Sequence, residues 1–553
     1  MLKVGQIEKV EITGYSSEGM GVCRIDGCAV FVPNAIRGEV CEIRVTHVSK
    51  HSAHGKIEQI LTRSPHRIPR ICPEAKLCGG CQLHHMDYAE ELFFKAQKVT
   101  DALNRLGGQA LDVVPITGAD GRPVFASAPA FPLRERRPSG PTGADEVAFD
   151  TLKRKTDGER ILRCAVGALS ERPSAACTPF GNGEECASCP PCDEPAEERI
   201  PRCAQNDGDG DGGAGGVPSA AYAYRNKAQY PVAERGGRPV AGFYKNRTHE
   251  VIPVARCAIL PEVFDRVRDV VLRWAREDRV PVYDERTGRG LLRHIYVRRG
   301  AASGQVMVCI VANGEKLPRE QRLVNALRRE IEALASVVLS VNRRDTNVVL
   351  GEEFRTLWGQ DFIEDTLCGF TFRLSPRSFY QVNHDQAERL YQKAVALADL
   401  HGAETVLDLY CGTGTITLAL SRSAGKAIGV EVVPQAIEDA KENAARNGVA
   451  NVEFFCADAT LAAQKLCAEG AKPEVIVVDP PRKGLAPEVI DAIVTMAPQR
   501  VVYVSCDPAT LARDVKRFSE QGYPLTHAEA FDLFPRTFHV ETVVSLSQLK
   551  SEV

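Results

Sequence analysis

An apolar run is followed by a polar or sulfur-containing side chain at five places in the C-terminal third of the chain. These side chains are Tyr410, Glu431, Asp458, Asp479 and Cys506. In a pattern of alternating strands and helices, the carboxyl ends of the parallel strands share one edge of the sheet, where ligands bind. We therefore expect these five side chains to gather at one ligand-binding site.

The first of these strand ends continues into a glycine turn, Gly412-Thr413-Gly414. The turn lacks the third spaced glycine of the dinucleotide fingerprint and the Gly-Lys-Ser/Thr of a phosphate loop, which argues against NAD and ATP. Glu431, at the end of the next predicted strand, can accept hydrogen bonds from ribose hydroxyls. The combination resembles the S-adenosylmethionine site of class I methyltransferases.

Cys506 lies between a predicted strand and a predicted helix, where the helix dipole should lower its pKa toward a nucleophilic thiolate. Methylation at carbon 5 of uracil requires such a nucleophile, because that carbon becomes reactive only after a thiolate adds to carbon 6. A base must then remove the proton from carbon 5, and Glu541 is the candidate base. The alternatives are a buried strand thiol and a surface carboxylate without catalytic roles.

A different methyl transfer is suggested by Asp479-Pro480-Pro481, which is similar to the motif of amino methyltransferases. In those enzymes an aromatic residue follows and stacks on the target base, whereas Arg482 follows here. The amino methyltransferase alternative is therefore weaker, and it would not need Cys506.

Three cysteines lie within ten residues near the N-terminus, and a fourth follows much later in the chain. They are Cys72, Cys78, Cys81 and Cys257. Three closely spaced thiolates with a distant fourth are typical of an iron-sulfur cluster, while zinc also accepts four thiolates. Nineteen cysteines in a chain that we expect to be cytoplasmic favour metal or catalytic thiols over disulfides.

The elements that must position these residues divide the chain into several parts. Residues 1–62 alternate with the strand period around Asp26-Gly27, a hairpin signal, and fit a small five-stranded barrel of oligonucleotide-binding type. Basic side chains near its end either face phosphates or form a solvated edge. These side chains are Arg44, Lys50, His51, His54 and Lys56.

Residues 87–106 have a helical pattern, and residues 222–351 read as a second α/β unit. Between them, residues 117–220 are rich in Pro, Gly, Ser and charge, which indicates a largely disordered insertion. Within it, Cys186, Cys189 and Cys192 either bind a second metal or are solvated thiols.

The composition sets broad limits on function. A chain of 553 residues suggests about three or four domains. A net charge of -3 gives no global attraction to nucleic acid, so an RNA-binding surface would be local. No run of 18 apolar residues and no signal peptide is visible, and we expect a cytoplasmic monomer without membrane contact.

Six motifs, in this order and spacing, resemble those in the catalytic domain of the RNA uracil-5 methyltransferases. They are Ser375–Asn383, Asp408–Gly414, Gly429–Glu431, Val478–Gly484, Ser505–Pro508 and Phe534–Glu541. Residues 1–62 also resemble the TRAM domain of this family, and the four cysteines match its [4Fe-4S] pattern. Thr415 stands where some members have Asn.

The resemblance implies a multidomain α/β protein that forms 5-methyluridine in RNA. It implies an OB-like TRAM barrel (1–62), a central α/β iron-sulfur domain (63–116 and 221–374), the insertion (117–220) and a class I, Rossmann-like methyltransferase domain (375–553). By the same match, Cys506 is the nucleophile and Glu541 the base, and the [4Fe-4S] ligands are the four cysteines. The residues implied to bind S-adenosylmethionine are Gln381, Tyr410, Glu431 and Asp479.

The family member that has both TRAM domain and cluster usually acts on large-subunit ribosomal RNA, so the expected substrate is 23S rRNA. The alternative is its relative acting on transfer RNA, which typically lacks both features. A third possibility is a cluster-bearing RNA-binding regulator without turnover, against which the intact Cys506 and Glu541 argue.

Overall fold

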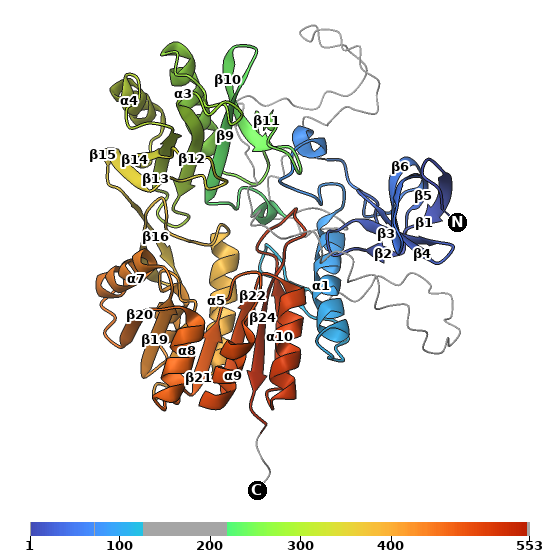
Figure 1. Ribbon diagram of the computed structural model, residues 1–553, viewed down its shortest axis with the longest axis vertical. Helices are drawn as coiled ribbons and strands as arrows, with labels where there is room; N and C mark the ends of the chain where they lie inside the picture. Colours follow the sequence, from blue (N-terminus) through green and yellow to red (C-terminus); the bar gives the residue numbers. More distant parts are fainter. Residues whose placement is uncertain (1, 71, 125–217, 550–553) are drawn as a thin grey trace, which may run out of the picture.

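The computed structural model describes residues 2–70, 72–124 and 218–549 (Figure 1). These residues form sheets of six, seven and nine strands, together with a two-stranded sheet of β16 (Ile363–Leu367) and β17 (Phe370–Leu374). Most of the predicted insertion, including Cys186, Cys189 and Cys192, lies outside the described residues. None of the helices in the described ranges combines the length and apolar character needed to span a bilayer.

The N-terminal unit is a six-stranded sheet in the order β1-β5-β6-β4-β3-β2, one strand more than predicted. Asp26 and Gly27 both have positive φ, 51° and 81°, and turn β3 into β4 as the hairpin signal predicted. The edge strand β1 also contacts β3, so the sheet curls around its own apolar core. Its strands are β1 (Ile7–Glu11), β2 (Gly14–Tyr15), β3 (Gly21–Ile25), β4 (Cys28–Val32), β5 (Val40–Val48) and β6 (Ser52–Thr62).

The central unit is a seven-stranded sheet in the order β11-β10-β9-β12-β13-β14-β15, packed against two helices, α3 (Val263–Glu277) and α4 (Glu320–Glu330). The second α/β unit predicted from the sequence is therefore confirmed. Its strands are β9 (Lys227–Arg235), β10 (Arg238–Tyr244), β11 (Val251–Pro253), β12 (Leu292–Arg299), β13 (Val306–Ala312), β14 (Leu334–Val341) and β15 (Glu353–Gly359).

The C-terminal unit is built on the nine-stranded sheet, in the order β20-β19-β18-β21-β22-β24-β23-β7-β8. The strands from β20 to β22 are parallel, as the alternating pattern predicted, and β24 then pairs antiparallel with β22. The first seven of these strands are β18 (Thr405–Leu409), β19 (Lys426–Glu431), β20 (Val452–Cys456), β21 (Val475–Val478), β22 (Arg500–Ser505), β23 (Leu525–Phe531) and β24 (Glu541–Ser547).

Helices connect the parallel strands and cover this sheet, so that the tips of β18, β19, β21 and β22 come together at one edge. The helices are α5 (His384–Ala398), α6 (Thr415–Ser421), α7 (Pro434–Arg446), α8 (Ala459–Ala468), α9 (Pro487–Met496) and α10 (Pro508–Glu520).

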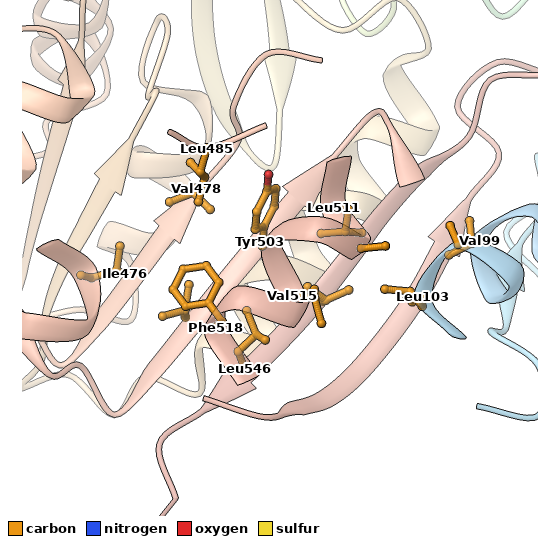
Figure 2. Packing of buried hydrophobic residues seen from close by; sticks show 14 of the residues in the cluster. Val99, Leu103, Ile476, Val478, Leu485, Tyr503, Leu511, Val515, Phe518 and Leu546 are labelled. Atoms are coloured by element: carbon orange, nitrogen blue, oxygen red, sulfur yellow. The ribbon is translucent and has the colours of Figure 1, made fainter. Parts of the chain in front are cut away.

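One helix from the N-terminal part of the chain belongs to the core of this last unit. The helix α1 (Tyr88–Arg105) packs on α10, and its side chains Val99 and Leu103 share one apolar cluster with Leu511 and Val515 (Figure 2). Two short strands after it, β7 (Ile116–Thr117) and β8 (Pro123–Val124), extend the nine-stranded sheet.

This arrangement differs from the predicted division of the chain, which placed residues 63–116 with the central unit. The apolar stripe of α1 is buried against the C-terminal sheet because α10 and β23 leave a face there that needs cover. Figure 1 shows α1 between that sheet and the N-terminal unit.

Candidate active site

The turn after β18 has an unusual backbone. Tyr410 has a φ of 75°, and the amides of Tyr410 and Cys411 both donate to the carbonyl oxygen of Val430, at 2.9 Å each. Gly414 has a φ of 82°, and a Cβ there would lie 3.1 Å from a ring carbon of Phe454. The turn therefore needs glycine and is fixed against the tip of β19.

The carboxylate of Glu431 ties these two strand tips together. It accepts hydrogen bonds from the amide of Gly412, at 3.3 Å, and from the amide of Val433, at 2.9 Å. Tyr410 and Glu431, two of the residues predicted to hold the methyl donor, therefore lie at one edge of the sheet. Asp458, also at a strand end, caps the helix α8 through the amides of Thr460 and Leu461.

A buried carboxylate, Asp408, lies behind the turn. Its Oδ2 accepts a hydrogen bond from the hydroxyl of Thr417 at 2.6 Å. Burial, with a contribution from Glu431 and against the opposing effect of Thr417, raises the pKa of Asp408 to about 7. The sequence contained Asp408 in a motif but gave no reason to assign it this role, because its effect depends on burial.

Tyr391 of α5 links the other predicted donor-binding residues. Burial and the charge of Asp479 raise the pKa of Tyr391, while the nearby side chains of Thr415 and Gln381 lower it. Burial raises the pKa of Asp479 to about 7, and Asp408 adds to this shift. The structure therefore brings Gln381 and Asp479 to the same edge of the sheet, through a tyrosine that the sequence analysis did not single out.

Cys506 and Glu541 lie at the neighbouring ends of two paired strands. Cys506 follows β22 and Glu541 begins β24, and Ser505 is paired with Thr542 across the antiparallel ladder. Burial raises the pKa of Glu541 to about 8, with a further contribution from Asp479. The predicted nucleophile and base are thus adjacent to each other.

The prediction that the helix dipole lowers the pKa of Cys506 is wrong. Burial, together with the charges of Glu541 and Asp479, raises that pKa to about 12. The first amides of α10 donate to the side chain of Asp507, from Ala509 at 2.9 Å and from Thr510 at 3.1 Å. The carboxylate, not the thiol, therefore receives the positive end of the helix.

Two cationic side chains near Cys506 and Glu541 were not assigned a role from the sequence. Arg482 lowers the pKa of both Cys506 and Glu541, and its Nη2 lies 3.4 Å from Nδ1 of His539. Lys98 of α1 donates to the carbonyl of Phe538 at 2.9 Å, and burial lowers its pKa to about 8. Arg482 was visible in a motif, whereas no local signal connects Lys98 to a site that lies more than 400 residues away.

The four predicted metal-binding cysteines come from distant parts of the chain and meet in one buried region. The pKa of Cys81 is raised by burial and by Cys78 and Cys72, and that of Cys257 is raised by burial and by all three of these thiols. Among the described residues, no three His, Cys, Asp or Glu side chains are close enough together to hold a metal ion. The structure thus places the four thiols near one another without closing them into a metal site.

Comparisons with known proteins agree with this picture. Residues 317–549 match the family model described as tRNA (Uracil-5-)-methyltransferase, and residues 2–57 match the TRAM domain. An uncharacterized RNA methyltransferase from Clostridium tetani is 36% identical over 97% of this chain and 95% of its own. Another, from Caldanaerobacter subterraneus, is 35% identical over 99% of each chain.

Among solved structures, a tRNA (uracil-54, C5)-methyltransferase from Pyrococcus abyssi, in complex with S-adenosyl-L-homocysteine, shares the fold. It is 23% identical, with a TM-score of 0.64, over 97% of this chain and 99% of its own. The TRAM domain and these relatives agree: the chain carries a domain of the tRNA (Uracil-5-)-methyltransferase type and belongs to the family of RNA methyltransferases that its 35–36% identical relatives represent.

Proposed function

We propose that this enzyme methylates carbon 5 of uracil in RNA through a covalent adduct with Cys506. The observation that carries the proposal is the pairing of β22 with β24, which puts Cys506 next to Glu541. Asp479 and Arg482 act electrostatically on both side chains. A thiol, a carboxyl group and a guanidinium group together provide what this reaction needs.

The reaction begins when the Cys506 thiol gives its proton to solvent and its sulfur bonds to carbon 6 of the flipped-out uracil. The electron pair of the carbon 5–carbon 6 double bond moves toward the carbon 4 oxygen and forms an enolate. Arg482 is a cation near Cys506, and it favours both the thiolate and the negative charge of the enolate. Extrusion of the base from its stack costs a few kcal/mol, which contacts elsewhere on the RNA must supply.

S-adenosylmethionine supplies the methyl group that becomes bonded to carbon 5. Glu541 then takes the carbon 5 proton, the bond from carbon 6 to the Cys506 sulfur breaks, and the double bond reforms. A carboxylate whose pKa is raised to about 8 is a stronger base than an ordinary glutamate. The burial of Glu541 therefore serves the last step of the reaction.

The donor site that we propose consists of Gln381, Tyr410, Glu431 and Asp479. Burial raises the pKa of Asp408 and that of Asp479 to about 7, so the surroundings of both carboxyl groups disfavour their negative charge. A sulfonium cation bound beside them would favour the charged forms, while the glycine turn lets the backbone approach the nucleoside closely.

We also propose that Cys72, Cys78, Cys81 and Cys257 hold a [4Fe-4S] cluster. The residues fit such a group in type and number, and Cys72 and Cys78 are near enough to Cys81 and Cys257 to raise the pKa of both of these buried thiols. Zinc is the alternative, because it accepts the same four ligands. Iron and acid-labile sulfide measured on protein purified without oxygen distinguish the two metals.

The substrate that we propose is 23S rRNA, because a TRAM domain and this cysteine pattern occur together in the family member acting on ribosomal RNA. One solved structure that shares the fold over 97% of this chain is named a tRNA enzyme, so transfer RNA is the second candidate. Mapping 5-methyluridine in both RNAs from a strain without this gene tests the choice. Loss of the modification from transfer RNA alone would contradict the ribosomal assignment.

The reaction itself is tested with labelled S-adenosylmethionine and RNA, followed by nucleoside analysis. The expected product is 5-methyluridine, and Cys506→Ser should abolish its formation. Label on an exocyclic amino group, retained in Cys506→Ser, would instead indicate an amino methyltransferase, and no transfer to any RNA would favour a binding protein without turnover.

A further inference from the structure

The loop that leads to Glu541, the proposed base, is held in place by side chains of other elements. Residues 532–540 join β23 to β24 and lead directly to Glu541. Side chains from other elements donate to backbone carbonyls along the whole loop: Asn383 to Leu533 (3.1 Å), Lys95 to Phe534 (3.1 Å), Tyr224 to Pro535 (3.1 Å) and Lys98 to Phe538 (2.9 Å). The position of Glu541 therefore depends on contacts far from it in sequence.

Arg536 lies at the centre of this loop and is fully buried. Its backbone amide and its Nη1 donate to the two carboxylate oxygens of Glu91, at 2.6 and 2.9 Å. Its Nη2 donates to the carbonyls of Leu83 and Met86, at 2.8 Å each. Its own carbonyl accepts the amides of Gln82 and Leu83 at 3.0 Å. One residue thus joins the loop to α1 and to the segment that follows Cys81.

A second set of buried contacts fixes the start of the loop. Lys95 donates to Glu91 at 2.8 Å and to Asp532 at 2.6 Å, and all three side chains are inaccessible to solvent. Tyr88 donates to the other oxygen of Asp532 at 2.7 Å. Buried charges are tolerated only in arrangements that pair them, so the network permits few positions of the loop relative to α1.

The backbone conformation of Arg536 also indicates that its contacts fix the position of the loop. Its φ is 69°, in the left-handed region that non-glycine residues avoid. Such a conformation persists only where surrounding contacts fix it, and at Arg536 the amide, the carbonyl and the guanidinium all take part in hydrogen bonds. The side chain therefore holds the loop in a shape that the backbone alone would not adopt.

We propose that Arg536 is a positioning residue for Glu541, acting from α1 through the loop. The inference rests on the proposed role of Glu541 as the base that releases the methylated uracil. A base must lie within hydrogen-bond reach of the proton that it removes, and a misplacement of about 1 Å can slow a step by roughly a hundredfold. Loosening the loop should therefore slow the release step while leaving nucleophilic attack by Cys506 intact.

The test compares Arg536→Lys with Glu541→Gln and with the wild-type enzyme on unmodified RNA. Glu541→Gln should accumulate a covalent protein–RNA adduct that carries the new methyl group. Arg536→Lys should accumulate the same adduct, at least about tenfold above wild type, because the misplaced base abstracts the proton slowly. Tritium release from uridine labelled at carbon 5 should fall by a similar factor, with KM for RNA changed less than about twofold.

Arg293→Lys is the matched control, because Arg293 is also buried and donates to two carbonyls, of Asn342 and Arg344, at 2.8 Å each. It lies in the central sheet, so its variant should show no adduct on unmodified RNA. Tyr88→Phe removes one hydrogen bond to Asp532 and carries the same test if Arg536→Lys does not fold.

Four results would overturn the inference. The first is an equal loss of adduct and of tritium release in Arg536→Lys, and the second is adduct accumulation in Arg293→Lys as well. Trapping by Glu541→Gln without trapping by either loop variant rejects the role of Arg536 alone. Absence of a trapped adduct in Glu541→Gln rejects the proposed base, and the role of Arg536 with it.

Discussion

Replacing Glu541 with glutamine should stabilise the unliganded protein, and the gain should grow with pH. Burial raises the pKa of this carboxyl group from 4.5 to about 8. Between these values the unfolded chain releases the proton while the folded chain keeps it, so the wild-type protein loses stability as pH rises. Because each pKa unit corresponds to about 1.36 kcal/mol, this rise of the pKa costs the folded wild-type protein about 4–5 kcal/mol at pH 8. Glutamine is neutral and of similar shape, so it avoids this loss.

Calorimetric melting at pH 5, 6, 7 and 8 provides the measurement. The Tm of Glu541→Gln should exceed that of the wild type by roughly 10 °C at pH 8, and the difference should nearly vanish at pH 5. Glu320→Gln is the control with the opposite sign, because the hydrogen bond from Arg355 lowers the pKa of Glu320. A pH-independent difference, or a glutamine variant less stable than wild type at pH 8, would refute the placement of an uncompensated carboxyl group at this site.

Three further changes test other parts of the structure. Thr417→Val removes the 2.6 Å hydrogen bond to Asp408 and should lower the free energy of unfolding by about 1–3 kcal/mol in urea titrations, whereas an unchanged value would contradict the bond. Gly414→Ala forces alanine into a φ of 82° and should lower the free energy of unfolding by about 1–2 kcal/mol. The same variant should bind S-adenosylmethionine more weakly in calorimetric titration, and unaltered binding would argue against a donor site at this turn. Cys257→Ser should lose iron and visible absorbance, while Cys309→Ser, at another buried thiol, should keep both; iron retained in the first variant would reject Cys257 as a ligand.

The C-terminal sheet could be predicted from the sequence because its evidence is local. Each of its parallel strands is a short apolar run, and the side chain that follows the run marks the edge where ligands bind. Tyr410, Glu431, Asp479 and Cys506 were therefore recognisable before any contact was known. Gln381 came from the family motif alone, and the structure explains its place through Tyr391.

The role of α1 could not be predicted, because it depends on contacts across more than 400 residues. Its helical period was clear, but a period does not show which sheet the apolar face covers. Lys95 and Asp532, which form a buried ion pair, are 437 positions apart. The same limit explains the error about the thiol of Cys506, since the helix after it was visible, whereas the burial of the thiol and its closeness to Glu541 were not.

The covalent role of Cys506 is tested with RNA that carries 5-fluorouridine at the target position. Fluorine stands in place of the carbon 5 proton, and the base cannot remove it. The enzyme should therefore stop as a stable adduct that contains the RNA and the transferred methyl group. Mass spectrometry should locate the bond at Cys506, and Cys506→Ala should form no adduct. An adduct at another residue, or methylation of uridine that persists in Cys506→Ala, would contradict the proposed mechanism.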